Sequence, residues 1–165
     1  FETGTPSFEA MAGTLGAIQY FAWIGQTFGA AYAPQYQDTF SGRRLALKQA
    51  MAAIEAYELE LNHSLLEGLG SIPGLHIHGI TSPHSLDRRV PTFSFTLDGW
   101  TPLAVAQALA KEDINVWDGN FYALSVTERL GLEESGGLVR VGLTHYNTQA
   151  EIDKLVTALM QITRA

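Results

Sequence analysis

The spacing of apolar side chains predicts helices in the first part of the chain. Residues 8–24 carry apolar groups on nearly every side, which is typical of a helix covered by its surroundings, and a small domain cannot cover all of them. We therefore expect this helix to face another domain or a second subunit. Thr5 and Pro6 fit the cap and the first position of the helix. Residues 25–42 show no clear period and predict a short helix with a loop, whereas a helical stripe runs over 43–68.

Beyond residue 70 the apolar period changes to two, which indicates strands. The predicted strands cover residues 74–79, 90–97, 114–117 and 138–143. Thr101 caps a predicted helix that runs to about Glu112, and a capping box of Thr148 and Glu151 opens a final helix. This order of elements predicts an α+β fold, in which helices cover one face of a small, mostly antiparallel sheet.

Composition and charge narrow the classes of function. The chain has 165 residues, 46% of them apolar and 16% charged, which is a globular balance. Ten Lys and Arg residues against 17 Asp and Glu residues give a net charge of −7, so we expect no nucleic acid and no membrane partner. The apolar block Tyr20–Gly25 is too short to span a bilayer. The absence of cysteine from these residues excludes a disulfide, a thiolate metal site and a cysteine nucleophile among them.

Gly4 and Thr5 precede the first predicted helix. Unpaired amides at a helix start, together with the Thr5 hydroxyl, favour an anion, and Gly4 lets a ligand approach the backbone. The alternative is that Thr5 only caps the helix. Because the chain opens at Phe1 directly in this turn, we expect the sequence to be the C-terminal part of a longer protein.

Arg140 is the most informative single residue, because it stands in the middle of an apolar predicted strand. An arginine there is costly unless its guanidinium meets a carboxylate or a phosphate. That partner is either a ligand or an acidic residue of the same domain.

The remaining candidates are a loop and three histidines. Residues 117–122 bring aromatic, acidic and amide groups together around a glycine, as functional loops and ordinary turns both do. His76 and His78 share one strand face, but no third ligand lies nearby in sequence, so we expect a solvated face and no metal site. His145 either contacts a ligand or is a surface residue before the last helix.

Two of these segments together resemble a known family. Phe1–Pro6 followed by a helix rich in Gly and Ala, and Val139–Thr148 followed by an acidic helix, resemble the class V aminotransferases, which are fold-type I pyridoxal-phosphate enzymes. The nearest branch is the cysteine-desulfurase-like proteins. The resemblance runs from Phe1 nearly to Ala165, with both motifs in the family's order.

The resemblance implies a cytoplasmic homodimer that acts on an amino acid. Residues 1–25 would end the large cofactor-binding domain, and 26–165 would form the small C-terminal domain. Gly4 and Thr5 would contact the phosphate of pyridoxal phosphate across the dimer interface. Arg140 would bind the substrate carboxylate, and Asn120 and His145 would border the site.

Two departures from the family limit what the resemblance implies. Aligning on Gly119 places Tyr122 where desulfurases of the family carry the catalytic cysteine, so a persulfide on this loop is excluded, and transamination, epimerisation or elimination stay open. The family's cofactor lysine lies upstream of the Gly-Thr-Pro element, so no catalytic residue is expected in this segment, and we expect the segment alone to be inactive. The alternative function is a non-catalytic ligand-binding or dimerisation module.

Overall fold

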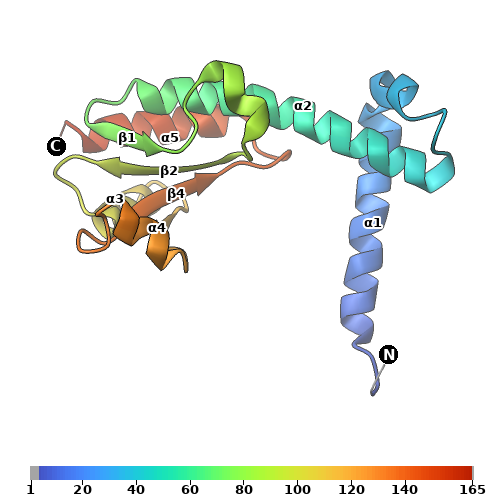
Figure 1. Ribbon diagram of the computed structural model, residues 1–165, viewed down its shortest axis with the longest axis horizontal. Coiled ribbons are helices and arrows are strands. Elements are labelled where there is room, and N and C mark those ends of the chain that lie inside the picture. Colours follow the sequence, from blue (N-terminus) through green and yellow to red (C-terminus); the bar gives the residue numbers. More distant parts are fainter. Residues whose placement is uncertain (1–3, 165) are drawn as a thin grey trace. The chain divides into compact units, whose positions relative to one another are not determined.

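Figure 1 shows the chain as a computed structural model, which describes residues 4–164. The chain divides into two compact units, Phe1–Tyr57 and Glu58–Ala165. The boundary between them falls inside one long helix, α2 (Gly42–Gly70). The expected division after residue 25 concerns the domains of a longer protein and stays a prediction.

The first unit is helical and packs through small residues. It contains α1 (Phe8–Phe28), the short 3-10 helix η1 (Ala30–Gln35) and the beginning of α2. A Cβ atom on Gly25 would lie only 1.8 Å from the carbonyl oxygen of Ala46, so the backbones of α1 and α2 are in direct contact there. Glycine permits this approach because it has no side chain.

The expected start of α1 was wrong by two residues. Thr5 and Pro6 precede the helix, and Ser7 is the cap, with its hydroxyl oxygen accepting a hydrogen bond from the Ala10 amide at 3.2 Å. Serine caps at least as well as threonine, and here it stands directly before the first helical residue, Phe8. The Thr5 side chain is therefore not used as a cap.

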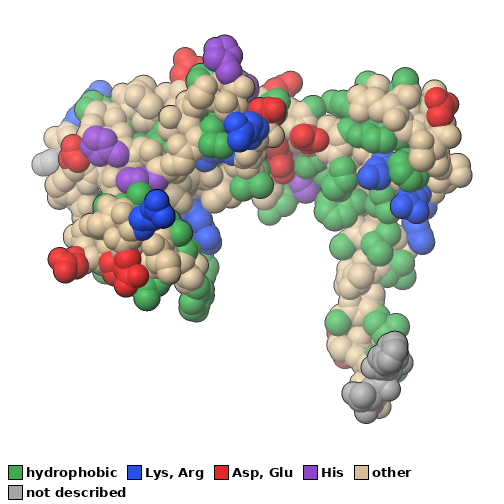
Figure 2. Space-filling model, viewed as in Figure 1, with side chains coloured by type: hydrophobic (Ala, Val, Ile, Leu, Met, Phe, Trp, Pro, Cys, Tyr) green, Lys and Arg blue, Asp and Glu red, His purple; other side chains and the backbone are tan. Residues whose placement is uncertain are grey.

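Much of α1 presents apolar side chains to the surface of its unit (Figure 2). The exposed large groups are Phe8, Met11, Leu15, Tyr20, Trp23 and Phe28. Phe8 is 65% exposed and Phe28 is 62% exposed. The expectation that another domain or subunit covers this helix stays a prediction.

The second unit contains the predicted antiparallel sheet. Its strands are β1 (Leu75–His78), β2 (Thr92–Leu97), β3 (Trp117–Gly119) and β4 (Leu138–Gly142), in the order β1-β2-β4-β3. Every neighbouring pair is antiparallel. The other elements of this unit are the end of α2, the 3-10 helix η2 (Pro83–Arg88), α3 (Pro102–Ala110), α4 (Leu124–Arg129) and α5 (Gln149–Ile162).

One face of the sheet forms the core and the other carries polar side chains. Helices α2, α3 and α5 supply buried leucines, isoleucine and valine that pack with the sheet (Figure 1). From the sheet, Phe93, Phe95 and Val139 are almost fully buried. Ser94 and Arg140 alternate with these residues and are only partly buried, because successive side chains of a strand point to opposite faces. The predicted α+β fold with one covered face is confirmed.

The predicted caps of α3 and α5 are also confirmed. Thr101 accepts from the Ala104 amide at 3.2 Å and opens α3. Thr148 and Glu151 form the capping box of α5, and the Glu151 carboxylate accepts from the Thr148 amide at 2.7 Å. This bond lowers the pKa of Glu151 below its ordinary value.

The third strand was predicted too early, at 114–117. In the structure Asp113 takes a left-handed conformation (φ 55°), and the Ile114 amide donates back to the Leu109 carbonyl at 3.1 Å. These residues therefore complete the C-terminal cap of α3. Pairing with β4 begins only at Trp117. Helix α4 was not predicted, because six residues carry too short a pattern to separate from a loop.

Candidate functional site

Arg140 lies in the middle of β4, on the face of the sheet that the core helices do not cover. The register pairs Arg140 with Ser94 on one side and with Trp117 on the other, and Ser94 pairs with His78. Paired residues share a face, so these four side chains form one row across the sheet. The sequence placed Arg140 in a strand, and only the register shows its neighbours.

Two aromatic rings contact the guanidinium of Arg140. Its Cζ atom lies 4.6 Å from the centre of the Phe121 ring and 5.8 Å from the centre of the Trp117 ring. These distances are in the range of cation–π interactions. Within residues 4–164, no carboxylate forms an ion pair with Arg140, and no hydrogen bond occupies its donors. The intradomain ion pair left open by the sequence is thus not formed among these residues, and the guanidinium is available to an anion.

The loop after β3 has an unusual backbone. Gly119 has φ 111°, and Phe121 and Tyr122 have φ 56° and 60°, in the left-handed region that residues with a Cβ atom rarely adopt. The Asn120 side chain bridges this loop, since its oxygen accepts from the Tyr122 amide at 3.2 Å. Tyr122 is fully exposed, whereas Phe121 is half-buried. The two neighbouring aromatic residues therefore have different surroundings.

Glu133 fixes the loop from its other side. The Asn120 side-chain amide donates to one carboxylate oxygen of Glu133 at 3.1 Å, and the hydroxyl of the buried Thr127 donates to the other at 2.5 Å. Hydrogen bonds to a carboxylate are the stronger kind. Both polar ends of Asn120 are therefore engaged within the loop.

A close backbone contact supports the same loop. A Cβ atom on Gly137 would lie 2.3 Å from the Gly119 carbonyl oxygen, and Gly137 also has φ 85°. Only glycine satisfies both conditions. A cavity of about 320 Å³ opens beside the contact, and the residues that line it are Trp117, Asp118, Gly119, Asn120, Phe121, Tyr122, Glu133 and Gly136.

His145 follows β4 and has its own partners. Its Nδ1 atom lies 3.7 Å from a carboxylate oxygen of Glu58, and its ring makes an edge contact with the Tyr146 ring at 5.4 Å. Both the His145 and the Glu58 side chains are largely buried. Of the predicted residues, Arg140 contacts the ring of Phe121, which directly follows Asn120, and His145 lies beside Glu58 of α2.

Gly4 and Thr5 belong to the first unit, which is described by itself. Both residues are exposed, and nothing lies within 4 Å of the Cβ position of Gly4. Within the described residues no hydrogen bond uses the Thr5 hydroxyl, since Ser7 caps α1. A small hydroxyl donor beside an unobstructed glycine fits a phosphate.

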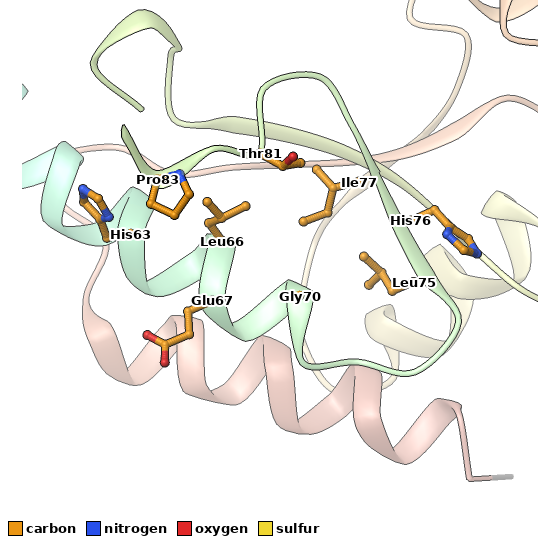
Figure 3. Close-up of a pocket in the computed structure, with 9 residues that line it drawn as sticks. All are labelled: His63, Leu66, Glu67, Gly70, Leu75, His76, Ile77, Thr81 and Pro83. Carbon is orange, nitrogen blue, oxygen red and sulfur yellow. The ribbon is translucent and has the colours of Figure 1, made fainter. Parts of the chain in front are cut away.

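A second cavity, of about 660 Å³, lies between α2, β1 and η2 (Figure 3). In the view of Figure 3, Leu66 and Ile77 lie between His63 and His76, and Pro83 lies beside His63. His76 pairs with Asp98 at 3.1 Å. None of the predicted site residues lines this cavity.

The other histidine of β1, His78, lies in the row of Arg140. Its Nε2 atom lies 3.2 Å from the Thr96 hydroxyl. Burial, and secondarily the neighbouring His76, lower the pKa of His78 below 6.5, so its ring is neutral at pH 7. In the described part of the chain no group of three or more His, Asp or Glu side chains is arranged to hold a metal ion.

Comparison with known proteins identifies the family of this chain. The family model for class-V aminotransferases matches residues 41–155. This chain belongs to that family. The match confirms the family predicted from the sequence. The enzymes of this family depend on pyridoxal phosphate.

The relatives include cysteine desulfurases. A cysteine desulfurase of Synechococcus elongatus is 33% identical over 98% of this chain and 21% of its own length. A probable cysteine desulfurase of Mycobacterium leprae is 29% identical over 98% of this chain and 31% of its own. An aminotransferase-like protein of Gibberella zeae is 38% identical over 70% of this chain and 29% of its own.

A solved structure supports the same conclusion. The apo structure of a cysteine desulfurase from Thermococcus onnurineus matches 74% of this chain and 29% of that chain, with a TM-score of 0.64 and 26% identity. The chain therefore spans less than a third of the length of each of these four proteins. No helix within residues 4–164 is long and apolar enough to cross a membrane.

The sequence did not reveal the contacts that surround Arg140 or the residues that support the loop after β3. It showed the aromatic loop but not the contact of Phe121 and Trp117 with Arg140, and Glu133 and Gly137 were passed over. The pair Gly136-Gly137 directly before β4 was a usable signal, because adjacent glycines often mark a close backbone approach or a positive φ.

Proposed function

We propose that this chain is the C-terminal part of a pyridoxal-phosphate-dependent enzyme acting on an amino acid, and that Arg140 binds the carboxylate of the substrate. The observation that carries the proposal is the Arg140 guanidinium itself. It stands on the uncovered face of the sheet, rests against two aromatic rings and has no acidic partner among residues 4–164. An arginine with unused donors on a sheet face is suited to a planar anion.

Arg140 contributes by orienting the substrate. A guanidinium presents two parallel N–H groups to a carboxylate, so a bidentate contact fixes both the position and the plane of the carboxylate. Holding that group fixes the direction of the bonds at the adjacent Cα atom, which is where the family's reactions take place. When bound, pyridoxal phosphate supplies an electron sink for the bond that breaks at Cα.

Gly4 and Thr5 are proposed to contact the cofactor phosphate. The exposed Thr5 hydroxyl and the open space at Gly4 fit this role. In the family this element reaches the cofactor of the other subunit, so the proposal includes a homodimer. The exposed apolar side chains of α1, such as Phe8 and Trp23, suit an interface of that kind.

Asn120 and His145 are proposed to border the substrate without being its main ligands. Asn120 acts through the loop, since Glu133 and the Tyr122 amide engage both ends of its side chain. His145 is held beside Glu58 and Tyr146, at the end of the segment that follows Arg140.

The reaction is proposed to differ from cysteine desulfuration. The 165 residues contain no cysteine, and Tyr122 occupies the exposed position in the loop after β3. A phenol cannot accept sulfur as a persulfide, so this loop fits transamination, epimerisation or elimination.

The proposal is tested on the full-length protein. Its absorbance spectrum is recorded after reconstitution with pyridoxal phosphate, before and after borohydride, and the spectral change on adding L-alanine gives a dissociation constant. We expect an absorbance band that borohydride removes. Loss of a desolvated charge pair costs about 2–5 kcal/mol, so Arg140→Ala should raise the dissociation constant about 30-fold or more.

Arg88→Ala is the matched control, because Arg88 is an exposed arginine of η2. It should leave the dissociation constant unchanged. An equal dissociation constant for Arg140→Ala and the unaltered protein would show that Arg140 does not bind the carboxylate. A protein that gains no absorbance band with pyridoxal phosphate would favour the non-catalytic module.

A further inference from the structure

We propose that Phe121 and Trp117 are positioning residues that hold the Arg140 guanidinium ready for a carboxylate. The inference rests on the proposed function, and it extends the site to two residues that do not themselves bind the anion. We name the three side chains the arginine clamp.

The clamp reduces the side-chain entropy that Arg140 loses when it binds a ligand. A long arginine side chain loses rotamer freedom when it is fixed, and an arginine that is not already held loses this freedom when the ligand binds. Within residues 4–164 no hydrogen bond or ion pair fixes Arg140. Its described contacts are with the Phe121 ring at 4.6 Å and the Trp117 ring at 5.8 Å. Cation–π contacts restrict the guanidinium without using its N–H donors, which therefore stay available to an anion.

The backbone conformation of the loop after β3 places the Phe121 ring beside Arg140. Phe121 has φ 56° and Tyr122 has φ 60°, a left-handed conformation in which the Cβ atom lies too close to the following carbonyl oxygen. The loop holds this conformation through the Asn120–Glu133 hydrogen bond and the close approach of Gly137 to Gly119. Phe121 is not part of the buried core cluster. Its left-handed backbone therefore does not serve to fill that core, and its ring lies against the Arg140 guanidinium.

Trp117 supports the guanidinium from the neighbouring strand. It pairs with Arg140 in the β3–β4 register, and its side chain is 61% exposed. A large aromatic residue that is exposed on a sheet face stabilises the fold little. Its position beside Arg140 is explained by the same cation–π contact.

The test compares variants of the full-length protein by ligand-observed NMR titration. Sodium propionate is the probe, because it carries a carboxylate without the reacting amine, and propionamide is the uncharged control. Phe121→Leu keeps an apolar side chain but removes the aromatic face, whereas Phe121→Tyr keeps the aromatic face. Val126→Ala, in the exposed part of α4, is the control for general effects on the segment.

We expect Phe121→Leu to raise the dissociation constant of propionate about two- to fivefold, which is the range of an exposed cation–π contact. Phe121→Tyr and Val126→Ala should match the unaltered protein, and propionamide should bind all variants alike. A second measurement follows the Nε–H resonance of Arg140 in arginine-labelled protein, which the Phe121 ring should shift and Phe121→Leu should return toward the position of a solvated arginine.

The outcomes separate the clamp from the proposed function. If Arg140→Ala abolishes propionate binding but Phe121→Leu leaves both binding and the Nε–H resonance unchanged, the clamp is wrong and the carboxylate site stands. If Arg140→Ala does not affect propionate binding, the proposed function itself fails. Equal weakening by Phe121→Leu, Phe121→Tyr and Val126→Ala would also overturn the clamp, because it would show a general disturbance of the loop.

Discussion

Replacing Gly137 by alanine should displace the loop that carries Phe121. The added Cβ atom would lie 2.3 Å from the carbonyl oxygen of Gly119 and 2.5 Å from its carbonyl carbon. Both are backbone atoms, which cannot turn aside as the end of a side chain can. The backbone on either side of the contact must therefore move.

The size of the effect follows from two costs at Gly137. A Cβ atom at φ 85° adds a left-handed strain of about 1–2 kcal/mol. Overpacking against a fixed neighbour adds about 1–3 kcal/mol. Together they predict a loss of about 2–5 kcal/mol in the free energy of unfolding.

Gly136→Ala is the matched control, because it separates these two costs. Gly136 has φ 94°, but its Cβ position meets only the Pro102 side chain at 3.6 Å, an ordinary contact. It should lose only the conformational part, about 1–2 kcal/mol. Urea unfolding of the full-length protein, followed by tryptophan fluorescence, gives both values.

The same pair of variants also reports on the site. Gly137→Ala should weaken propionate binding, since the displaced loop carries Phe121 away from Arg140, whereas Gly136→Ala should not. If the two variants unfold at the same urea concentration, the close approach between Gly137 and Gly119 does not exist in solution, and the account of the loop is refuted.

Two further predictions concern groups beside the sheet. The Arg89 guanidinium donates to the carbonyls of Ile80 and Thr92 and stacks on the Phe93 ring at 3.6 Å from its centre. Arg89→Lys should lower the free energy of unfolding by about 1–3 kcal/mol, because an ammonium cannot span two carbonyls as a guanidinium does, while Arg88→Lys should have no effect. For His78, burial holds the pKa of the folded state below 6.5, so the unfolded state takes up the proton first as the pH falls. Stability should therefore decline as the pH is lowered from 6.5, and His78→Gln should reduce that decline; identical pH profiles of the two proteins in urea unfolding would contradict this.

Local signals in the sequence were sufficient for most elements of the fold. The caps at Thr101 and at Thr148 with Glu151 were found because a cap is a contact between residues three apart. The alternation around Phe93 and Phe95 predicted β2, because the pleat of a strand has a period of two. The start of α1 was misplaced because Thr5 and Ser7 are both good caps and Ser7 is the one used. The third strand was placed too early because the left-handed Asp113 ends α3 just before the predicted strand.

The candidate site also combines features that the sequence predicts with features that only the tertiary structure shows. The sequence by itself determined that Arg140 stands in an apolar strand, since the cost of burying an arginine is a property of that residue and its neighbours in the chain. Only the tertiary structure decided what surrounds it. The register brings Trp117 beside Arg140, and the loop places Phe121 on its guanidinium. These contacts join residues about 20 positions apart, through a backbone conformation that depends on Gly119 and Gly137. No periodic pattern encodes such a contact, because it arises from where two strands and a loop meet in space.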